Sequence, residues 1–95
     1  MIEYLYNAVR ATANQDITLT AILTDTDNQP IESGCSVMLH DDTSMLGMYE
    51  GDYLENGIWS FTIPAAATTG RSGRYWYCIC EKGSNLCFKQ PIYLV

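Results

Sequence analysis

Basic residues are scarce in this sequence and unevenly placed. The chain of 95 residues has five Lys and Arg against eleven Asp and Glu, a formal net charge of −6. Residues 11–70 contain no Lys or Arg. A phosphate-binding surface needs clustered cations, so the composition argues against nucleic acid as a ligand. A basic protein surface suits this charge better, although acidic loops that keep a protein in solution explain it equally well.

The sequence also lacks the long apolar runs of membrane proteins. No run approaches the ~20 residues that a transmembrane helix needs, nothing at the start resembles a signal peptide, and no Asn-x-Ser/Thr sequon occurs. We therefore expect no membrane partner and a protein made and kept in the cytoplasm. An apolar content of 47% is ordinary for a globular protein, and the length suits a single domain, 1–95.

Catalytic constellations are missing as well. His40 is the only histidine, so a Cys-His or Ser-His-Asp nucleophile system would have to use it. No serine or cysteine is marked as its partner, no G-x-S-x-G motif occurs, and a loop histidine beside Asp41 and Asp42 is more often simply solvated. The sequence therefore predicts a protein that is not an enzyme and has no cofactor.

What the sequence does have is alternation of apolar and polar residues, the pattern of half-buried strands. Residues 17–24 alternate most regularly, and residues 35–40 and 58–63 do so too. Turn-forming residues 25–30 follow the first of these strands, and Asn56-Gly57, a strong hairpin signal, precedes the last. The residues predicted to face the core are Ile17, Leu19, Ala21, Leu23, Cys35, Val37, Leu39, Trp59, Phe61 and Ile63.

Two stretches are less regular. Residues 4–13 fit both a helical stripe and a strand, and the β context that follows favours a strand. Residues 45–54 contain Gly and Met and predict one short, irregular edge strand. Together with a hairpin at the end of the chain, these segments give about seven short strands roughly 8–12 residues apart, which is the spacing of a β-sandwich.

The final hairpin is the most informative stretch. Tyr75–Cys80 consists of aromatic, β-branched and Cys residues, which suit a strand. Gly and Asn in the loop Lys82–Asn85 suit a tight turn, and Leu86–Val95 forms the returning strand. If the loop has these four residues, Glu81 faces Leu86, and Cys80 then lies opposite Cys87.

The same register separates the two faces of the hairpin. Cys78 lies opposite Lys89, and an unpaired lysine is rarely buried, so the face with Lys89 is the outer one. A bulge would invert this assignment. The predicted core face carries Tyr75, Tyr77, Ile79, Phe88, Ile92 and Leu94. The predicted outer face carries Trp76, Cys78, Cys80, Cys87, Lys89 and Tyr93.

Three segments of this pattern resemble a known family. The segments ITLTAILTDTDNQPIESGCSVML, ENGIWSFTIP and GRYWYCIC are similar to the immunoglobulin-like sandwiches of bacterial and phage surface or structural proteins. The resemblance covers about residues 17–94 and places Gly73-x-Tyr75 at the family's G-x-Y motif. It implies an all-β, immunoglobulin-like antiparallel β-sandwich of about seven strands. With Cys35 inward and Cys78 and Cys80 outward, the inter-sheet disulfide of antibody domains is not expected.

Four cysteines in a cytoplasmic chain are more often thiols than disulfides. A cross-strand disulfide between Cys80 and Cys87 is geometrically feasible, and an oxidising medium would favour it. Zinc held by Cys78, Cys80 and Cys87 is a weaker alternative, because the usual C-x₂-C knuckle is missing. Thiols that act as small hydrophobic side chains explain the same residues.

The acidic loop offers oxygen ligands for a hard cation. Its candidate calcium ligands are Asp25, Asp27 and Asn28. Asx-turn chemistry explains the same residues without a metal, and no glutamate follows at the EF-hand spacing. We therefore predict no metal site here.

Aromatic residues are more numerous than one small core needs, with seven Tyr and two Trp. Trp76 and Tyr93 fall on the predicted outer face, and Met45, Met48 and Tyr49 lie in the presumed edge segment. Tyr, Trp and Met are enriched in contact patches, but aromatic residues on an outer face also pair across strands simply to stabilise a sheet. These five residues are the interface candidates.

The first hypothesis is a non-enzymatic protein-interaction or structural module that docks on a larger assembly, such as a phage or prophage virion, through a protein partner or self-association. The alternative is a carbohydrate- or small-ligand-binding sandwich that uses its surface aromatics, assisted by Ca²⁺.

Overall fold

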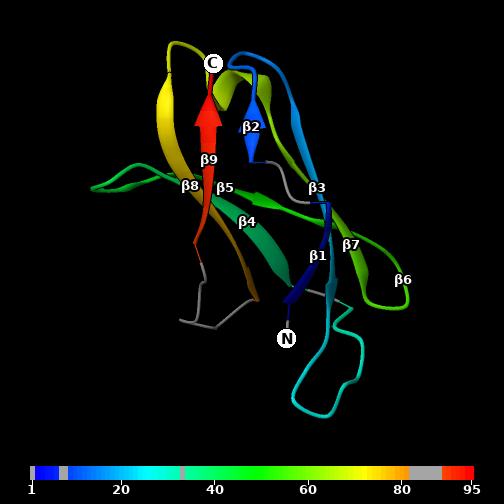
Figure 1. Ribbon diagram of the computed structural model, residues 1–95. Helices are drawn as coiled ribbons and strands as arrows, with labels where there is room; N and C mark the ends of the chain where they lie inside the picture. The colour runs from blue at the N-terminus through cyan, green and yellow to red at the C-terminus, as the bar shows by residue number, and fades with distance from the viewer. Residues whose placement is uncertain (1, 7–8, 33, 82–88) are drawn as a thin grey trace.

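The chain folds into two packed β-sheets (Figure 1). The computed structural model describes residues 2–6, 9–32, 34–81 and 89–95. These residues form nine strands, one 3₁₀ turn and no α-helix, which confirms the predicted all-β fold. None of their helical segments is long and apolar enough to cross a membrane. The elements are β1 (Ile2–Tyr6), β2 (Arg10–Ala11), β3 (Ile17–Leu23), β4 (Cys35–His40), β5 (Met45–Glu50), β6 (Asp52–Glu55), β7 (Ile58–Ile63), η1 (Ala65–Ala67), β8 (Gly73–Glu81) and β9 (Gln90–Leu94).

The strand order is that of an immunoglobulin-like sandwich. Sheet A has the order β1-β3-β7-β6, and sheet B has the order β2-β9-β8-β4-β5. The strand pairs among the described residues are antiparallel, except β2–β9, which is parallel. The described residues form nine strands rather than about seven because two of the predicted strands are each divided between the sheets.

The first of these divisions lies near the N-terminus. β1 pairs with β3 in sheet A, whereas β2 pairs with β9 in sheet B, so the chain crosses between the sheets before Arg10. The prediction of a strand over residues 4–13 is thus right about the type of secondary structure. The segment forms parts of two strands in different sheets, however, and not one strand. Tyr4 of β1 faces inward, and its ring meets the Tyr77 ring edge-on at 6.1 Å between centroids. Burial raises the pKa of the Tyr4 hydroxyl, and the nearby backbone of Ile79 opposes the shift.

The second division lies at Gly51. The prediction of an edge strand over residues 45–54 is right about the edge position and wrong about the number, because β5 is an edge of sheet B and β6 is an edge of sheet A. A Cβ atom at Gly51 would lie 2.4 Å from Cε1 of the buried Phe61 ring, so the crossing requires glycine. The Gly51 amide also donates a hydrogen bond to the Cys35 carbonyl oxygen at 3.0 Å.

The core follows the predicted alternation. Every residue predicted to face inward from β3, β4 and β7 is buried. Trp59 donates its indole N–H to the Ile31 carbonyl at 2.7 Å and stacks on Phe61 at 6.0 Å between centroids, so its one polar atom is satisfied. Asn56 and Gly57 have φ values of 51° and 80°, as a two-residue hairpin turn between β6 and β7 requires.

The small-residue connection after β7 is held by long-range hydrogen bonds. Thr68 is buried, and its Oγ1 accepts a hydrogen bond from the Asn14 amide at 2.9 Å. The Asp16 carboxylate accepts a second one from the Ala65 amide at 2.8 Å. These contacts join the turn before β3 to the connection between β7 and β8, and so fix the end of the sandwich where β8 begins.

Candidate interaction surface

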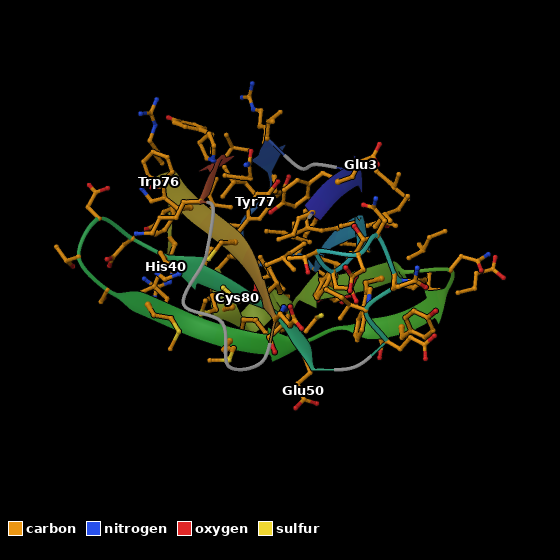
Figure 2. All side chains as sticks on the ribbon, turned by 90° about the horizontal axis from the view of Figure 1, so that it is seen from below. Glu3, His40, Glu50, Trp76, Tyr77 and Cys80 are labelled. Carbon is orange, nitrogen blue, oxygen red and sulfur yellow. The ribbon has the colours of Figure 1, made fainter. Side chains whose placement is uncertain are left out.

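The final ribbon has the two faces that the sequence predicts. Tyr77 pairs with Gln90 and Trp76 with Pro91, which is the register derived from a four-residue loop, although that loop lies outside the described residues. Figure 2 shows Tyr77 and Trp76 on opposite sides of β8. The described residues of the predicted core face are buried Tyr77, Ile79, Ile92 and Leu94 and half-buried Tyr75. Phe88 and Cys87 lie outside the described residues.

The outer face of sheet B is assembled from five strands in register. β4 pairs with β5 on one side and with β8 on the other, and β9 pairs with β8 and β2. Alternation within each strand then decides which side chains point outward. Those residues are Arg10, Ser36, Met38, His40, Met45, Met48, Glu50, Arg74, Trp76, Cys78, Cys80, Pro91 and Tyr93.

Trp76 lies on this face and is half-buried. Its indole N–H donates a hydrogen bond to the Asp42 carboxylate at 3.3 Å. The guanidinium carbon of Arg74 lies 5.7 Å from the ring centroid, within the range of a cation–π interaction. Neighbouring side chains therefore hold the ring at its edge and over one face.

Cys78 corrects part of the predicted outer face. The residue lies on the predicted outer face, but it is 0% exposed there, so its sulfur does not reach the surface. It is buried on the outer side of sheet B rather than in the cluster between the sheets, and its Sγ lies 3.5 Å from Nε2 of His40. Neighbouring side chains thus cover the strand from outside, which alternation along one strand does not report.

The cysteines differ in chemical state. Cys78 and Cys80 are disulfide-bonded, contrary to the expectation of thiols. Cys87 lies outside the described residues, and each cysteine forms only one disulfide, so Cys87 is able to bond Cys78 or Cys80 but not both. The pairing of Cys80 with Cys87 therefore stays a prediction. A disulfide sulfur offers no thiolate, so these two cysteines lend no support to zinc. Cys35 faces inward as predicted, and burial, helped by the charge of Glu81, raises the pKa of its thiol to about 11.

His40 is the last residue of β4 and is half-buried, not a solvated loop residue as predicted. Burial lowers the pKa of its imidazole, the positive charge of Lys89 lowers it further, and Asp41 opposes the shift. The ring is therefore mainly neutral at pH 7. The Asp41 carboxylate accepts hydrogen bonds from the amides of Thr43 and Ser44, both at 2.8 Å, and so belongs to its own turn.

The edge strand β5 supplies two of the five interface candidates to this face. Met45 is exposed, and Met48 is 56% exposed. Met48 pairs with Met38, and Met45 pairs with His40. Tyr93, from β9, is 52% exposed on the same face.

Tyr49 is the candidate that the structure does not bring to this face. It is half-buried and packs against the core cluster on the inner side of sheet B. Its hydroxyl end occupies the space that a Cβ atom at Gly47 would fill, at 2.3 Å. The Gly47 position therefore accommodates the tyrosine and leaves it no role on the outer surface.

A groove of about 510 Å³ opens beside Met48 of β5. Part of its wall consists of sulfur-containing side chains, those of Met38, Met48 and Cys80. Another part is polar and consists of Ser36, Glu50 and Glu81. The groove lies at the end of the outer face where Glu50 and Cys80 are found (Figure 2). It contains no histidine, and no group of three His, Cys, Asp or Glu arranged for a metal occurs among the described residues.

The calcium candidates serve a turn. Oδ1 of Asp25 accepts hydrogen bonds from the amides of Asp27 and Gln29, at 2.8 and 2.9 Å. Asn28 adopts a φ of 60°, a conformation that asparagine tolerates in turns. The geometry of the turn thus accounts for the acidic and amide residues of this loop.

Comparison with known proteins identifies the fold. No protein-family model and no curated protein matches the chain. The filamin domain of Lin-41 matches with a TM-score of 0.69 and 15% identity, over 99% of this chain and 91% of that chain. The native conformation of E. coli alpha-2-macroglobulin gives 0.69 and 15%, over 98% of this chain and 6% of that chain. Domains 4 and 5 of the S-layer protein SbsC match with a TM-score of 0.58 and 15% identity, over 100% of this chain and 51% of that chain.

These matches confirm the immunoglobulin-like β-sandwich. The chain spans nearly the whole filamin domain but only a small part of the macroglobulin and about half of the S-layer pair. Such distant likeness shows the fold alone, because one sandwich serves many unrelated functions. The function must therefore be argued from the surface.

Proposed function

We propose that this domain is a non-enzymatic interaction or structural module that docks on a larger assembly through the outer face of sheet B. The observation that carries the proposal is the apolar and aromatic composition of this face, with Met45, Met48 and Tyr93 exposed beside half-buried Trp76. Methionine, tyrosine and tryptophan are the residue types in which contact surfaces are enriched. The assembly that the sequence resemblance suggests is a phage or prophage virion.

The aromatic residues suit a protein partner better than a sugar. A sugar-binding platform needs an aromatic ring with an open face. Arg74 lies over the Trp76 ring, and Asp42 ties its edge to the neighbouring loop. Tyr93 is exposed, and its paired residues Arg10 and Arg74 are cations rather than a second ring. A protein surface, which supplies both apolar and charged groups, matches this mixture.

Site-specific photocrosslinking tests the proposal. A photoreactive amino acid is placed at Met48 or Tyr93 in the cells that naturally make the protein, and at Leu54 as the matched control. Leu54 is 56% exposed but belongs to β6 of sheet A. After irradiation, adducts are identified by mass spectrometry. We expect one protein to crosslink from Met48 and from Tyr93, and not from Leu54.

The same experiment can contradict the proposal. Equal crosslinking from Leu54 would show that the contact is not specific to sheet B. The absence of adducts at both sheet B positions would remove the docking function. The substitution Trp76→Ala should weaken the same crosslinks while leaving folding nearly intact.

A further inference from the structure

The few cations of this acidic chain gather on the outer face of sheet B. The five basic residues are Arg10, Arg71, Arg74, Lys82 and Lys89. Arg10 and Arg74 are exposed on this face, in β2 and β8. Lys89 is exposed just before β9, and its charge acts on His40 of the same face. By contrast, Arg71 donates its Nε–H to the Ala67 carbonyl at 3.1 Å, in the connection before β8.

Two of these cations flank an aromatic ring in a single row across the sheet. Tyr93 pairs with Arg10 on one side and with Arg74 on the other. Adjacent strands lie about 4.8 Å apart, so the Cα atoms of the two arginines are about 10 Å apart. Arg74 also lies 5.7 Å from the Trp76 ring centroid, so this row continues into the next one.

Nearby carboxylates are engaged elsewhere. Asp42 accepts the Trp76 indole N–H, and Asp41 accepts the amides of its own turn. Among the described residues, neither Arg10, Arg74 nor Lys89 forms an ion pair with a carboxylate. These three cations therefore have hydrogen-bonding capacity available to a partner.

We propose that the basic patch formed by Arg10, Arg74, Lys89, Trp76 and Tyr93 binds an acidic, extended segment of another protein. An extended chain advances about 3.3 Å per residue. Side chains alternate between the two sides of an extended chain, so carboxylates four residues apart point the same way and lie about 13 Å apart. Such a pair would reach the two long arginine side chains, while the residue midway between them packs on Tyr93. Arginine suits this task because its planar guanidinium binds a carboxylate through two parallel hydrogen bonds.

The net negative charge of the molecule opposes an acidic partner only at long range. A protein with a net charge of −6 repels acidic partners at long range. At physiological ionic strength charges are screened beyond about 8 Å, so the local patch decides what binds there. This inference rests on the proposed function, since it names the chemistry of the partner for the same face.

Fluorescence anisotropy tests the inference with a defined probe. The probe is a labelled peptide in which every fourth residue is glutamate, and its control has glutamine at those positions. The proteins are the wild type, Arg10→Gln, Arg74→Gln and Arg71→Gln, each variant losing one positive charge. We expect the glutamate peptide alone to bind, and each patch variant to weaken binding about tenfold, as loss of a charge-assisted hydrogen bond does. Arg71→Gln should bind like the wild type.

Each alternative outcome overturns the inference. If Arg71→Gln weakens binding as much as the patch variants, only net charge matters and the patch is not a site. If polygalacturonate binds and the glutamate peptide does not, the partner is an acidic sugar. If the wild type self-associates in sedimentation and Arg74→Gln abolishes that, the patch binds a second copy of this chain.

The two proposals fail separately. Specific crosslinks from Met48 and Tyr93 with no binding of the glutamate peptide would leave the docking face standing and remove only its acidic partner. Binding of the peptide without crosslinks would leave the patch standing and remove the docking function.

Discussion

The two outer faces of the sandwich differ although their inner faces are alike. Both sheets bury alternate residues in one shared core. Outside, the central strands of sheet A pair Thr18 with Thr62 and Thr20 with Ser60, and only the last pair, Ile22 with Ile58, is apolar. Sheet B instead carries methionines, Trp76, Tyr93 and two arginines on its outer face.

The difference distinguishes side chains that the fold needs from side chains that it does not need. The inner alternation alone buries enough apolar surface for a sandwich. Hydroxyl pairs cover most of the central strands of sheet A, where they suit a solvated β-surface, and the exposed leucines of this sheet, Leu5 and Leu54, lie on its edge strands. Exposed methionine and tyrosine on sheet B add little to burial, so folding does not explain their presence there. This contrast makes sheet B the face on which function is to be sought.

The largest expected effect is a loss of stability, and it should differ between two neighbouring residues on opposite faces of β8. Tyr77→Ala should lower the free energy of unfolding by about 3–5 kcal/mol, since it opens a cavity in the core. Trp76→Ala removes one hydrogen bond, one cation–π contact and partial burial, and should cost about 1 kcal/mol. Urea unfolding of both variants measures the two values. Equal costs would show that the face assignment is wrong.

A second comparison concerns two glycines next to aromatic rings. Gly51→Ala should destabilise by about 1–3 kcal/mol, because the new methyl group meets the Phe61 ring, which the core holds in place. Gly47→Ala is the matched control, since it meets the hydroxyl end of half-buried Tyr49, which is able to move aside. In thermal unfolding, the melting temperature of Gly51→Ala should lie well below that of Gly47→Ala. The reverse order would show that β5 and β6 do not turn tightly at Gly51.

The sequence predicts the fold where the determinants are local. Alternation in β3, β4 and β7 identifies both the strands and their buried residues. Asn56-Gly57 predicts its hairpin because the turn needs two residues with positive φ. The register of β8 with β9 is the one that a four-residue loop predicts. Each of these inferences uses residues that are close together in the chain.

The rest depends on contacts between distant segments. Gly51 separates two strands because of the Phe61 ring, which belongs to another strand. Cys78 is buried on the outer side because His40 and its neighbours cover it. Arg10 joins the basic patch only through the parallel pairing of β2 with β9. Periodicity along a single strand carries no information on such contacts.

The inner face of sheet B can also be probed through Cys35. Its thiol is buried and has a pKa of about 11, so at pH 8 almost none of it is the reactive thiolate. We expect iodoacetamide to modify Cys35 at least about tenfold more slowly in the folded protein than in urea, measured by peptide mass spectrometry. Equal rates would contradict its inward position.

The smallest expected effect lies on the outer face, at His40. Its pKa lies below the usual 6.5 in the folded protein, mainly through burial and further through Lys89. The unfolded chain therefore binds the proton more readily. Its contribution to stability is complete above that usual value, decreases as the pH falls through it, and stops changing below the folded pKa.

The melting temperature should thus fall slightly between pH 7 and about pH 5, with a smaller fall in His40→Gln. Asp41 does not confound this window, because hydrogen bonds from Thr43 and Ser44 hold the pKa of its carboxyl below the usual 3.8. Identical profiles for wild type and His40→Gln would mean that the imidazole is as well solvated in the folded chain as in the unfolded one. In that case the outer face of sheet B would be more open around Cys78 than its burial indicates.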